Sequence, residues 1–403
     1  MKIAVIGGGA AGFFAAINAK ENFTNSQVTI FEKTSKVLSK VKISGGGRCN
    51  VTNAVETMEE LLHAYPRGKR VLKSAFYHFN NNDMMQWLES KNVALAIQDD
   101  QCVFPKSQQS QTIIDCFLEK TNRLKIPIKL NSAVLKLQQI EEGKIALSFK
   151  EGKKVFDKVI VTTGGSPKRK GLEWLEKIGH QIEEPVPSLF TFNMPTENIT
   201  KLMGVVVQNV QVKIQKTKLI ANGPLLITHW GMSGPAILTL SSFGARVLSE
   251  KNYRFITQVN WINQFDFDRI KKELQMVQQK YPKKQMQKIK PFSIPSRLWL
   301  YLLEKSSIPL DKKWIEIGNK TINKLIAILT NDTYLVNGKT TFKEEFVTCG
   351  GVSLQSINPK TLESKIIKNL YFAGEVLDID GITGGFNFQA AWSTAYVTAK
   401  LMD

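Results

Sequence analysis

The chain has 403 residues, of which 43% are hydrophobic and 22% are charged. This composition excludes a disordered or fibrous chain, and the length suits two or three domains with sizeable cores. The net charge of +19 raises the question of a polyanionic partner, such as tRNA or an anionic lipid surface. However, the lysines are scattered, and their densest run, Lys271–Lys290, has few aromatic residues to stack on bases. We therefore favour a solvated basic face over a nucleic-acid partner.

The four cysteines, Cys49, Cys102, Cys116 and Cys349, form no C-x-x-C pair. This spacing argues against a zinc ribbon or a dithiol redox centre, and no other metal-binding spacing stands out. Met1 runs directly into an apolar strand, which leaves no room for a cleaved leader. We expect a cytoplasmic protein with reduced thiols, no bound metal and no membrane span.

The first 33 residues carry the strongest motif. An apolar strand (2–6) leads into the turn Gly7-Gly8-Gly9-Ala10-Ala11-Gly12, an alanine-rich helix and a second strand that ends at Glu32. Gly7, Gly9 and Gly12 match G-x-G-x-x-G, which lets a pyrophosphate approach the backbone amides at a helix N-terminus. Glu32 can accept hydrogen bonds from a ribose and would repel a 2′-phosphate. The motif predicts bound FAD or NAD rather than NADP.

A second glycine-rich segment follows. Residues 34–53 are predicted to form an irregular loop around Ser44-Gly45-Gly46-Gly47-Arg48-Cys49-Asn50, since consecutive glycines make a poor helix and a poor strand. Its backbone amides can face phosphate or ribityl oxygens.

The middle of the chain changes in character at Pro185. Before it, the patterns predict a helix over 69–91, extended chain over 93–104, a helix over 111–124, and a β-meander over 127–161 that ends in Thr163-Gly164-Gly165. After it they predict strands over 204–214, 219–227 and 253–260, then mostly helix over 266–330. A second G-x-G-x-x-G is absent from the sequence, which argues against a nicotinamide domain of the glutathione-reductase type.

The C-terminal region again contains glycine turns. A buried strand runs into the acidic loop that ends at Asp378, and Gly384-Gly385 opens the last helix. The N-terminus of that helix can stabilise the pyrimidine edge of a flavin, where reduction builds negative charge. A purely structural helix would not need this glycine pair, so the pattern favours a flavin.

Taken together, these motifs resemble those of the bacterial NAD(P)/FAD-dependent oxidoreductases known as BaiN-like or YhiN-like, which include aminoacetone-oxidase-like flavoproteins. The matching segments are 5–12, 43–50, 228–235, 348–352 and 371–387. The resemblance implies an α/β fold with a Rossmann-like FAD-binding domain of the two-dinucleotide-binding flavoprotein type. It also implies an inserted β-barrel-like domain that carries a helical subdomain.

From these features we expect three domains. The FAD-binding domain would comprise 1–185 and 345–403, the β-rich insert 186–265 and 315–344, and the helical subdomain 266–314.

The resemblance also implies which residues hold non-covalent FAD. Glu32 would bind the adenosine ribose, Glu375 and Asp378 the ribityl chain or pyrophosphate, and 385–387 the isoalloxazine. The full predicted cofactor-binding set is Gly7, Gly9, Ala10, Ala11, Gly12, Glu32, Lys33, Ser44, Gly46, Gly47, Arg48, Cys49, Asn50, Val134, Thr163, Gly164, Gly374, Glu375, Asp378, Gly384, Gly385, Phe386 and Asn387.

The expected function is an FAD-dependent oxidoreductase that transfers hydride to or from a small organic substrate. NADH or NADPH, bound transiently, or O₂ would be the second redox partner. His229 is the candidate catalytic residue for proton transfer, and a packed, hydrogen-bonded histidine is the alternative. Two other functions stay open: an FAD-dependent RNA-modifying enzyme, supported by the charge, and a flavin-binding protein without turnover.

Overall fold

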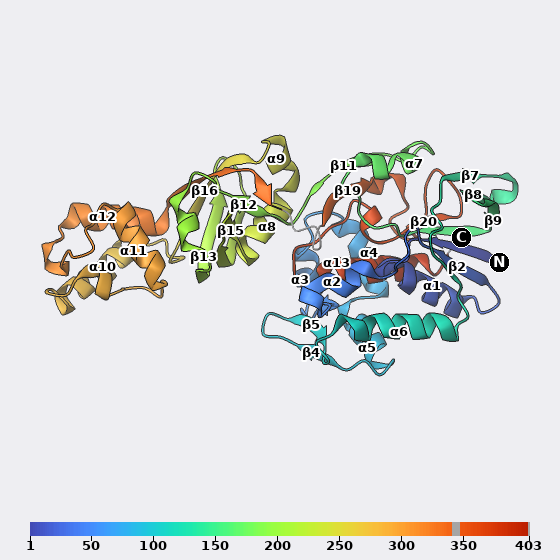
Figure 1. The fold of residues 1–403 in the computed structure, drawn as a ribbon, viewed down its shortest axis with the longest axis horizontal. Coiled ribbons are helices and arrows are strands. Elements are labelled where there is room, and N and C mark those ends of the chain that lie inside the picture. The colour runs from blue at the N-terminus through green and yellow to red at the C-terminus, as the bar shows by residue number, and fades with distance from the viewer. Residues whose placement is uncertain (341–346, 402–403) are drawn as a thin grey trace. The chain divides into compact units, whose positions relative to one another are not determined.

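The computed structural model describes residues 1–340 and 347–401 (Figure 1). It divides into two compact units, which we call unit 1 (Met1–Ser188 and Phe342–Asp403) and unit 2 (Leu189–Thr341). The expected domain boundary between 344 and 345 lies outside the described residues. Within the described residues, no helix is both long and apolar enough to cross a membrane.

Unit 1 is built on a parallel sheet of five strands in the order β20-β10-β1-β2-β6. The central strand is apolar on both faces, with Ile3 and Val5 buried in one core cluster and Ala4 and Ile6 in another. This is the pattern of a strand covered on both sides. The strands are β1 (Lys2–Ile6), β2 (Gln27–Phe31), β6 (Ile128–Lys129), β10 (Lys158–Val161) and β20 (Leu370–Phe372).

Helices cover one face of this sheet and a small meander covers the other. On the helical face, Phe14, Phe117 and Trp392 pack ring against ring, with Phe117 and Trp392 stacked at 5.5 Å. On the other face, Phe31 packs against Phe149 and Phe156 of the meander. The elements are α1 (Ala10–Asn22), α6 (Ser110–Arg123) and α13 (Phe386–Thr398), and β7 (Lys136–Gln139), β8 (Ile145–Phe149) and β9 (Gly152–Phe156).

Two predictions of secondary structure were partly wrong here. The predicted helix over 69–91 is two helices, α4 (Lys69–His78) and α5 (Asn81–Glu89), because the Asn80 side chain accepts hydrogen bonds from two backbone amides and caps α5. The predicted meander over 127–161 contains only β7, β8 and β9. Its first and last strands, β6 and β10, pair instead with the parallel sheet.

The predicted loop over 34–53 contains a short helix, α2 (Ser39–Gly47), which loses helical geometry at Ser44, Gly45 and Gly46. The prediction holds for the glycine-rich part and is wrong for the residues before it. The remaining elements of unit 1 are β3 (Thr52–Asn53), α3 (Met58–His63), β4 (Leu95–Ile97), β5 (Cys102–Pro105), α7 (Glu173–Glu176), β11 (Ile182–Pro187) and β19 (Thr348–Val352).

Unit 2 is built on an antiparallel sheet of seven strands in the order β17-β16-β13-β14-β15-β12-β18. The two strands at the ends of this order follow one another in the chain and are separated only by Gly338. The two ends of the strand order therefore lie near each other, so the sheet curls in the way expected of the predicted barrel-like insert. The strands are β12 (Thr191–Asn193), β13 (Val206–Ile214), β14 (Ile220–Ile227), β15 (Gly231–Ser233), β16 (Arg254–Asn260), β17 (Asp332–Asn337) and β18 (Lys339–Thr340).

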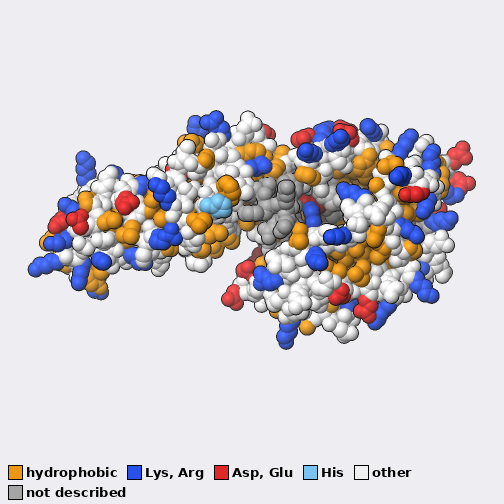
Figure 2. All heavy atoms as spheres, viewed as in Figure 1, with side chains coloured by type: hydrophobic (Ala, Val, Ile, Leu, Met, Phe, Trp, Pro, Cys, Tyr) orange, Lys and Arg blue, Asp and Glu red, His pale blue; other side chains and the backbone are white. Residues whose placement is uncertain are grey.

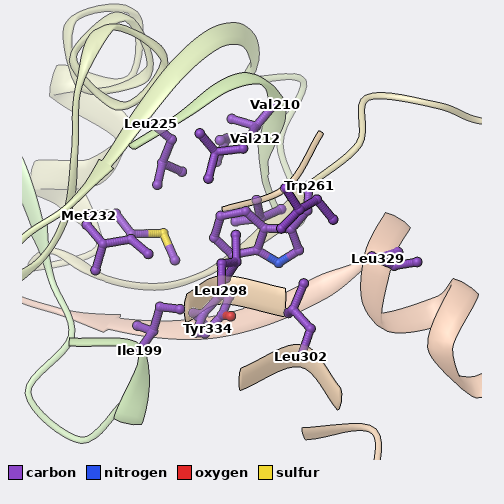
Figure 3. Packing of buried hydrophobic residues seen from close by; sticks show 14 of the residues in the cluster. Ile199, Val210, Val212, Leu225, Met232, Trp261, Leu298, Leu302, Leu329 and Tyr334 are labelled. Atoms are coloured by element: carbon purple, nitrogen blue, oxygen red, sulfur yellow. The ribbon is translucent and has the colours of Figure 1, made fainter. Parts of the chain in front are cut away.

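Helices complete unit 2 and share its core. Trp261, which follows β16, and Tyr334 of β17 pack in one cluster with Leu298, Leu302 and Leu329 from the helices (Figure 3). The helical subdomain is thus an extension of the barrel core. The helices are α8 (Pro235–Phe243), α9 (Ala245–Glu250), α10 (Phe267–Lys280), α11 (Ser296–Lys305) and α12 (Asn319–Thr330).

One buried acid, Asp332, connects the sheet of unit 2 to its helices. Asp332 accepts hydrogen bonds from Lys305 Nζ (2.5 Å), Trp261 Nε1 (2.9 Å) and the Tyr334 hydroxyl, and its side chain is fully buried. It ties helix α11 to the sheet.

We expect Asp332→Ala to lower the free energy of unfolding by about 3 kcal/mol, because the Lys305 ammonium and the Trp261 indole lose their acceptor inside the core. Urea denaturation measures the change. Asp311→Ala, at an exposed position, is the control and should cost less than about 0.5 kcal/mol. Equal losses in the two variants would show that Asp332 does not join the layers.

Candidate functional site

The glycine turn lies where β1 ends and α1 begins. A Cβ on Gly12 would lie 1.9 Å from the carbonyl oxygen of Gly7, and a Cβ on Gly7 would lie 2.4 Å from that of Thr162. A Cβ on Gly9 would meet nothing within 4 Å. The turn is therefore closed toward the protein at Gly7 and Gly12 and open at Gly9, where the helix N-terminus begins.

Glu32 lies beside this turn. Its Oε2 accepts a hydrogen bond from the Gly8 amide (2.8 Å), and its Oε1 accepts one from the Thr34 amide (2.8 Å). The Glu32 carbonyl accepts the Ser132 amide (2.8 Å), so the segment that carries half-buried Val134 runs alongside. Lys33 is exposed.

The second glycine segment reaches the same turn. The Leu38 amide donates to the Gly8 carbonyl (2.8 Å), which brings the start of α2 to the turn. A Cβ on Gly46 or Gly47 would meet nothing within 4 Å. Arg48 instead packs on the protein, since its guanidinium lies 4.2 Å from the centre of the Phe104 ring.

The side chains of Cys49 and Ser44 are directed into the protein, which leaves their backbone as the part that can face a ligand. The Cys49 side chain is fully buried in the helical-face core, and burial raises the pKa of its thiol to about 12. Ser44 Oγ donates to the Val41 carbonyl (2.9 Å). Asn50 differs, because its Oδ1 is buried and has no hydrogen-bond partner among the described residues. This oxygen lies 2.8 Å from where a Cβ of Gly385 would be.

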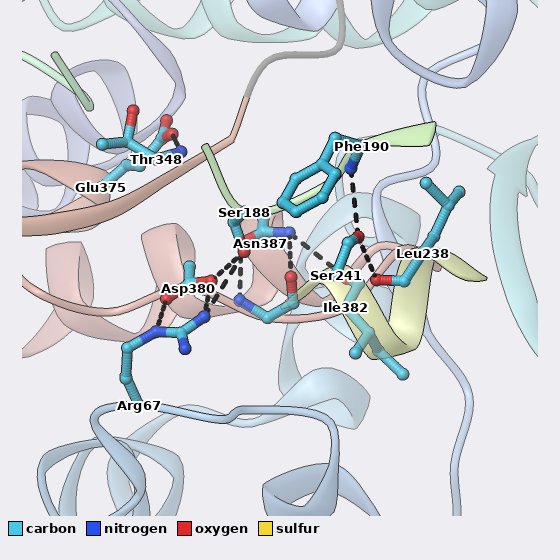
Figure 4. Close-up of polar contacts among 11 residues, drawn as sticks. Arg67, Ser188, Phe190, Leu238, Ser241, Thr348, Glu375, Asp380, Ile382 and Asn387 are labelled. Carbon is cyan, nitrogen blue, oxygen red and sulfur yellow. Dashed lines mark hydrogen bonds and ion pairs between the residues drawn. The ribbon is translucent and has the colours of Figure 1, made fainter. Parts of the chain in front are cut away.

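The acidic loop after β20 is the next segment at this edge of the sheet. Glu375 accepts the Thr348 amide through Oε1 (2.9 Å, Figure 4) and pairs with Lys40 through Oε2 (2.7 Å). Gly374 packs on Ala11, and Gly165 packs on Glu375 and Thr348. Thr348 Oγ1 is buried without a hydrogen-bond partner in the described part of the chain.

Of four more predicted residues, Thr163 and Gly164 are open, Asp378 is enclosed and Ala10 is intermediate. Thr163 is exposed, and a Cβ on Gly164 would meet nothing within 4 Å. Asp378 is buried, and its amide donates to the Val352 carbonyl (3.0 Å). Ala10, the first residue of α1, is half-buried.

The last glycine turn, 381–385, is held by side chains. Asn387 accepts the Gly381 amide (2.9 Å) and donates to the Gly381 carbonyl (3.0 Å). Asn53 donates to the Gly384 carbonyl (3.0 Å), and the Tyr65 hydroxyl donates to the Phe386 carbonyl (2.7 Å). Asn387 thus shapes the turn through its side chain.

A buried ion pair beside this turn was missed by the sequence analysis. Arg67 binds Asp380 through two nitrogens, and the Ser188 hydroxyl donates to the same carboxylate (Figure 4). Burial raises the pKa of Asp380, and the hydrogen bond and charge of Arg67 oppose that rise. An acid beside Gly381 was a visible signal in the sequence, whereas nothing marked Arg67, which is 313 residues away.

His229 lies in unit 2, in the turn between β14 and β15, where it is exposed and its ring lies 4.4 Å from that of Trp230. The packed alternative is therefore wrong. Its role in proton transfer stays a prediction. All the predicted cofactor residues lie in unit 1.

The fold and these turns define a Rossmann-type flavoprotein architecture with a barrel-like insert, as expected. The profile of the family described as "HI0933-like protein Rossmann domain" matches residues 1–401. The chain belongs to this family, which confirms the resemblance found in the sequence.

Named relatives cover nearly the whole chain. A ribosomal RNA dihydrouridine synthase of Haemophilus influenzae is 28% identical over 98% of this chain and 96% of its own length. A 3-dehydro-bile acid delta(4,6)-reductase of Clostridium scindens is 25% identical, with 99% and 98% covered. Among solved structures, 3-ketosteroid delta1-dehydrogenase of Sterolibacterium denitrificans has the same fold, with a TM-score of 0.52, 11% identity, and 99% and 98% covered.

The turn geometry separates two glycine substitutions. Gly9→Ala should leave the fold intact and lower the occupancy of a bound dinucleotide, because its Cβ enters the open side. Gly12→Ala should lower stability by at least about 3 kcal/mol or prevent folding, because its Cβ overlaps a backbone oxygen. Thermal melting and cofactor content after purification measure the two effects. Glu32→Ala should also lower occupancy. Full occupancy in both Gly9→Ala and Glu32→Ala would contradict the site.

The thiols should react slowly in the folded chain. Burial is the main cause that raises the pKa of Cys49 to about 12 and those of Cys102 and Cys116 to about 11. Because the thiolate is the reactive form, the reaction with a disulfide reagent should be slow at pH 8 and speed up only as pH approaches these values. Denaturant should release four reactive thiols. Fast labelling of Cys49 in the native chain would contradict this placement.

Proposed function

We propose that the chain is an FAD-dependent reductase that adds hydrogen across a carbon–carbon double bond conjugated to a carbonyl group. The observation that carries the cofactor in this proposal is the open glycine cradle. Gly9, Gly46, Gly47 and Gly164 leave space at their α-carbons on segments that contact one another at one edge of the parallel sheet.

The residues present fit FAD. The amides at the start of α1 and the positive end of its dipole suit the pyrophosphate, and Glu32 suits a ribose. Asn50 Oδ1 and Thr348 Oγ1 are buried polar atoms without a hydrogen-bond partner among the described residues, so a ligand polar group would satisfy them. The N-terminus of α13 suits the flavin ring. Bound FAD would supply hydride chemistry.

The reaction class comes from the relatives. Making dihydrouridine saturates a double bond conjugated to a carbonyl of uracil, and a delta(4,6)-reductase of a 3-dehydro-bile acid saturates double bonds conjugated to a ketone. A hydride goes to the carbon distant from the carbonyl and a proton to the adjacent carbon. We propose for this chain the reaction that both names share, the reduction of a carbon–carbon double bond conjugated to a carbonyl group. We propose His229 as the proton donor.

Uridine in RNA is the substrate that we favour over a small ketone. Curated relatives from two species, Haemophilus influenzae and Escherichia coli, carry the name ribosomal RNA dihydrouridine synthase, each at 28% identity. The net charge of +19 fits an RNA partner, which the sequence analysis had kept as an alternative. NADH or NADPH would be the source of the hydride, bound transiently.

The test is the absorbance spectrum of the purified chain under anaerobic conditions. Flavin bands that bleach on adding NADH or NADPH are expected, followed by their return when ribosomal RNA lacking dihydrouridine is added. A 3-keto steroid with conjugated double bonds is the comparison substrate. Nuclease digestion and mass spectrometry of the RNA should then find dihydrouridine. No flavin after incubation with FAD would contradict the cofactor, and return of the bands with the steroid alone would contradict RNA.

A further inference from the structure

The positive charge of the chain is unevenly divided. Unit 2 contains 22 Lys and Arg against 9 Asp and Glu, whereas the rest of the chain contains 32 against 26. Unit 2 therefore carries +13 of the net +19 on fewer than half of the residues. Figure 2 shows Lys and Arg side chains spread over the helical end of this unit.

The tertiary structure gathers part of this charge on two neighbouring segments. After α10, the chain over 282–286 runs antiparallel to 312–315. The Trp314 amide donates to the Lys284 carbonyl (3.1 Å), the Met286 amide donates to the Lys312 carbonyl (2.8 Å), and Gln285 forms a bridge with Lys313. Lysines about 28 residues apart in sequence thereby become neighbours.

We define the lysine cluster as Lys283, Lys284, Lys288, Lys312 and Lys313. All are exposed except Lys312, whose side chain is 40% exposed and lies 3.8 Å from Glu316. The segment 280–290 contains no acidic residue. Like charges on adjacent segments repel one another over the screening length of about 8 Å at physiological salt, and Glu316 offsets the charge of Lys312 alone. A bound polyanion would remove that repulsion.

We propose that the lysine cluster of unit 2 is a docking surface for the phosphate backbone of RNA. This inference rests on the proposed RNA substrate and adds where the RNA is held. Lysine ammonium groups act as mobile point charges, which suits contacts to phosphates, and such contacts carry no sequence information. The cluster would thus bring RNA to the enzyme with little sequence preference and leave the choice of uridine to the flavin site.

The test compares two triple variants of the full chain. Lys283→Glu/Lys284→Glu/Lys313→Glu changes the cluster. Lys136→Glu/Lys150→Glu/Lys153→Glu makes the same charge change on exposed lysines of the β7–β9 meander of unit 1. The measured quantities are the affinity for fragmented, end-labelled ribosomal RNA at several salt concentrations, the flavin content and the rate of flavin reduction by NADH or NADPH.

We expect the cluster variant to lose at least about tenfold in RNA affinity and to reduce the salt slope by about two to three, because three phosphate contacts are removed. The control should lose less than about threefold, from long-range charge alone. Flavin content and reduction should be unchanged in both variants. Equal losses of affinity in the two variants would overturn the proposal.

Two further outcomes separate this inference from the proposed function. A wild-type chain that binds FAD and is reduced by NADH or NADPH but does not bind RNA would overturn the docking surface and leave the proposed reductase activity intact.

Met276 and Ile315 on this part of unit 2 are 60% and 61% exposed, so phosphatidylglycerol vesicles are the competing probe. Binding of vesicles in place of RNA, lost in the cluster variant, would overturn RNA as the occupant.

Discussion

The close packing of two glycines against a strand end is the constraint on which unit 1 depends. The backbone of Gly12 lies against the Gly7 carbonyl, and Gly7 lies against Thr162 at the end of β10. No residue with a side chain could bring these three segments so close. That approach places the N-terminus of α1 at the carboxyl edge of the sheet, where the amides of its first turn are free to bind an anion.

Several polar side chains around this edge form hydrogen bonds with the protein itself and thereby fix the position of nearby backbone segments. Glu32 accepts the Gly8 amide, Glu375 ties Thr348 to Lys40, and Asn387 holds Gly381. The Arg67–Asp380 ion pair fixes the start of the last glycine turn in the same way. A ligand would then meet loops that are already ordered, which reduces the entropy lost on binding.

Unit 2 has a different physical character. Its sheet curls so that β17 and β18, joined through Gly338, lie at the two ends of the strand order, and its core continues from the sheet into the helices. Its surface carries most of the net charge. The predicted cofactor residues all lie in unit 1, whereas most of the net charge lies on unit 2, and the proposed RNA docking surface is part of that charge.

By itself the sequence determined the glycine turn at the edge where we propose that the nucleotide binds, because that turn is encoded locally. The spacing of Gly7, Gly9, Gly12 and Glu32 was enough to predict a Rossmann-type fold. The more specific segments 43–50 and 371–387 added the resemblance to the family. Tertiary structure decided what depends on residues far apart in the chain. It decided that β6 and β10 join the parallel sheet, that Arg67 pairs with Asp380, and that Cys49 points into the core. It also brought Lys283 and Lys284 beside Lys313. Such contacts follow from which segments pair across long loops, and the local periodicity of a sequence does not contain that information.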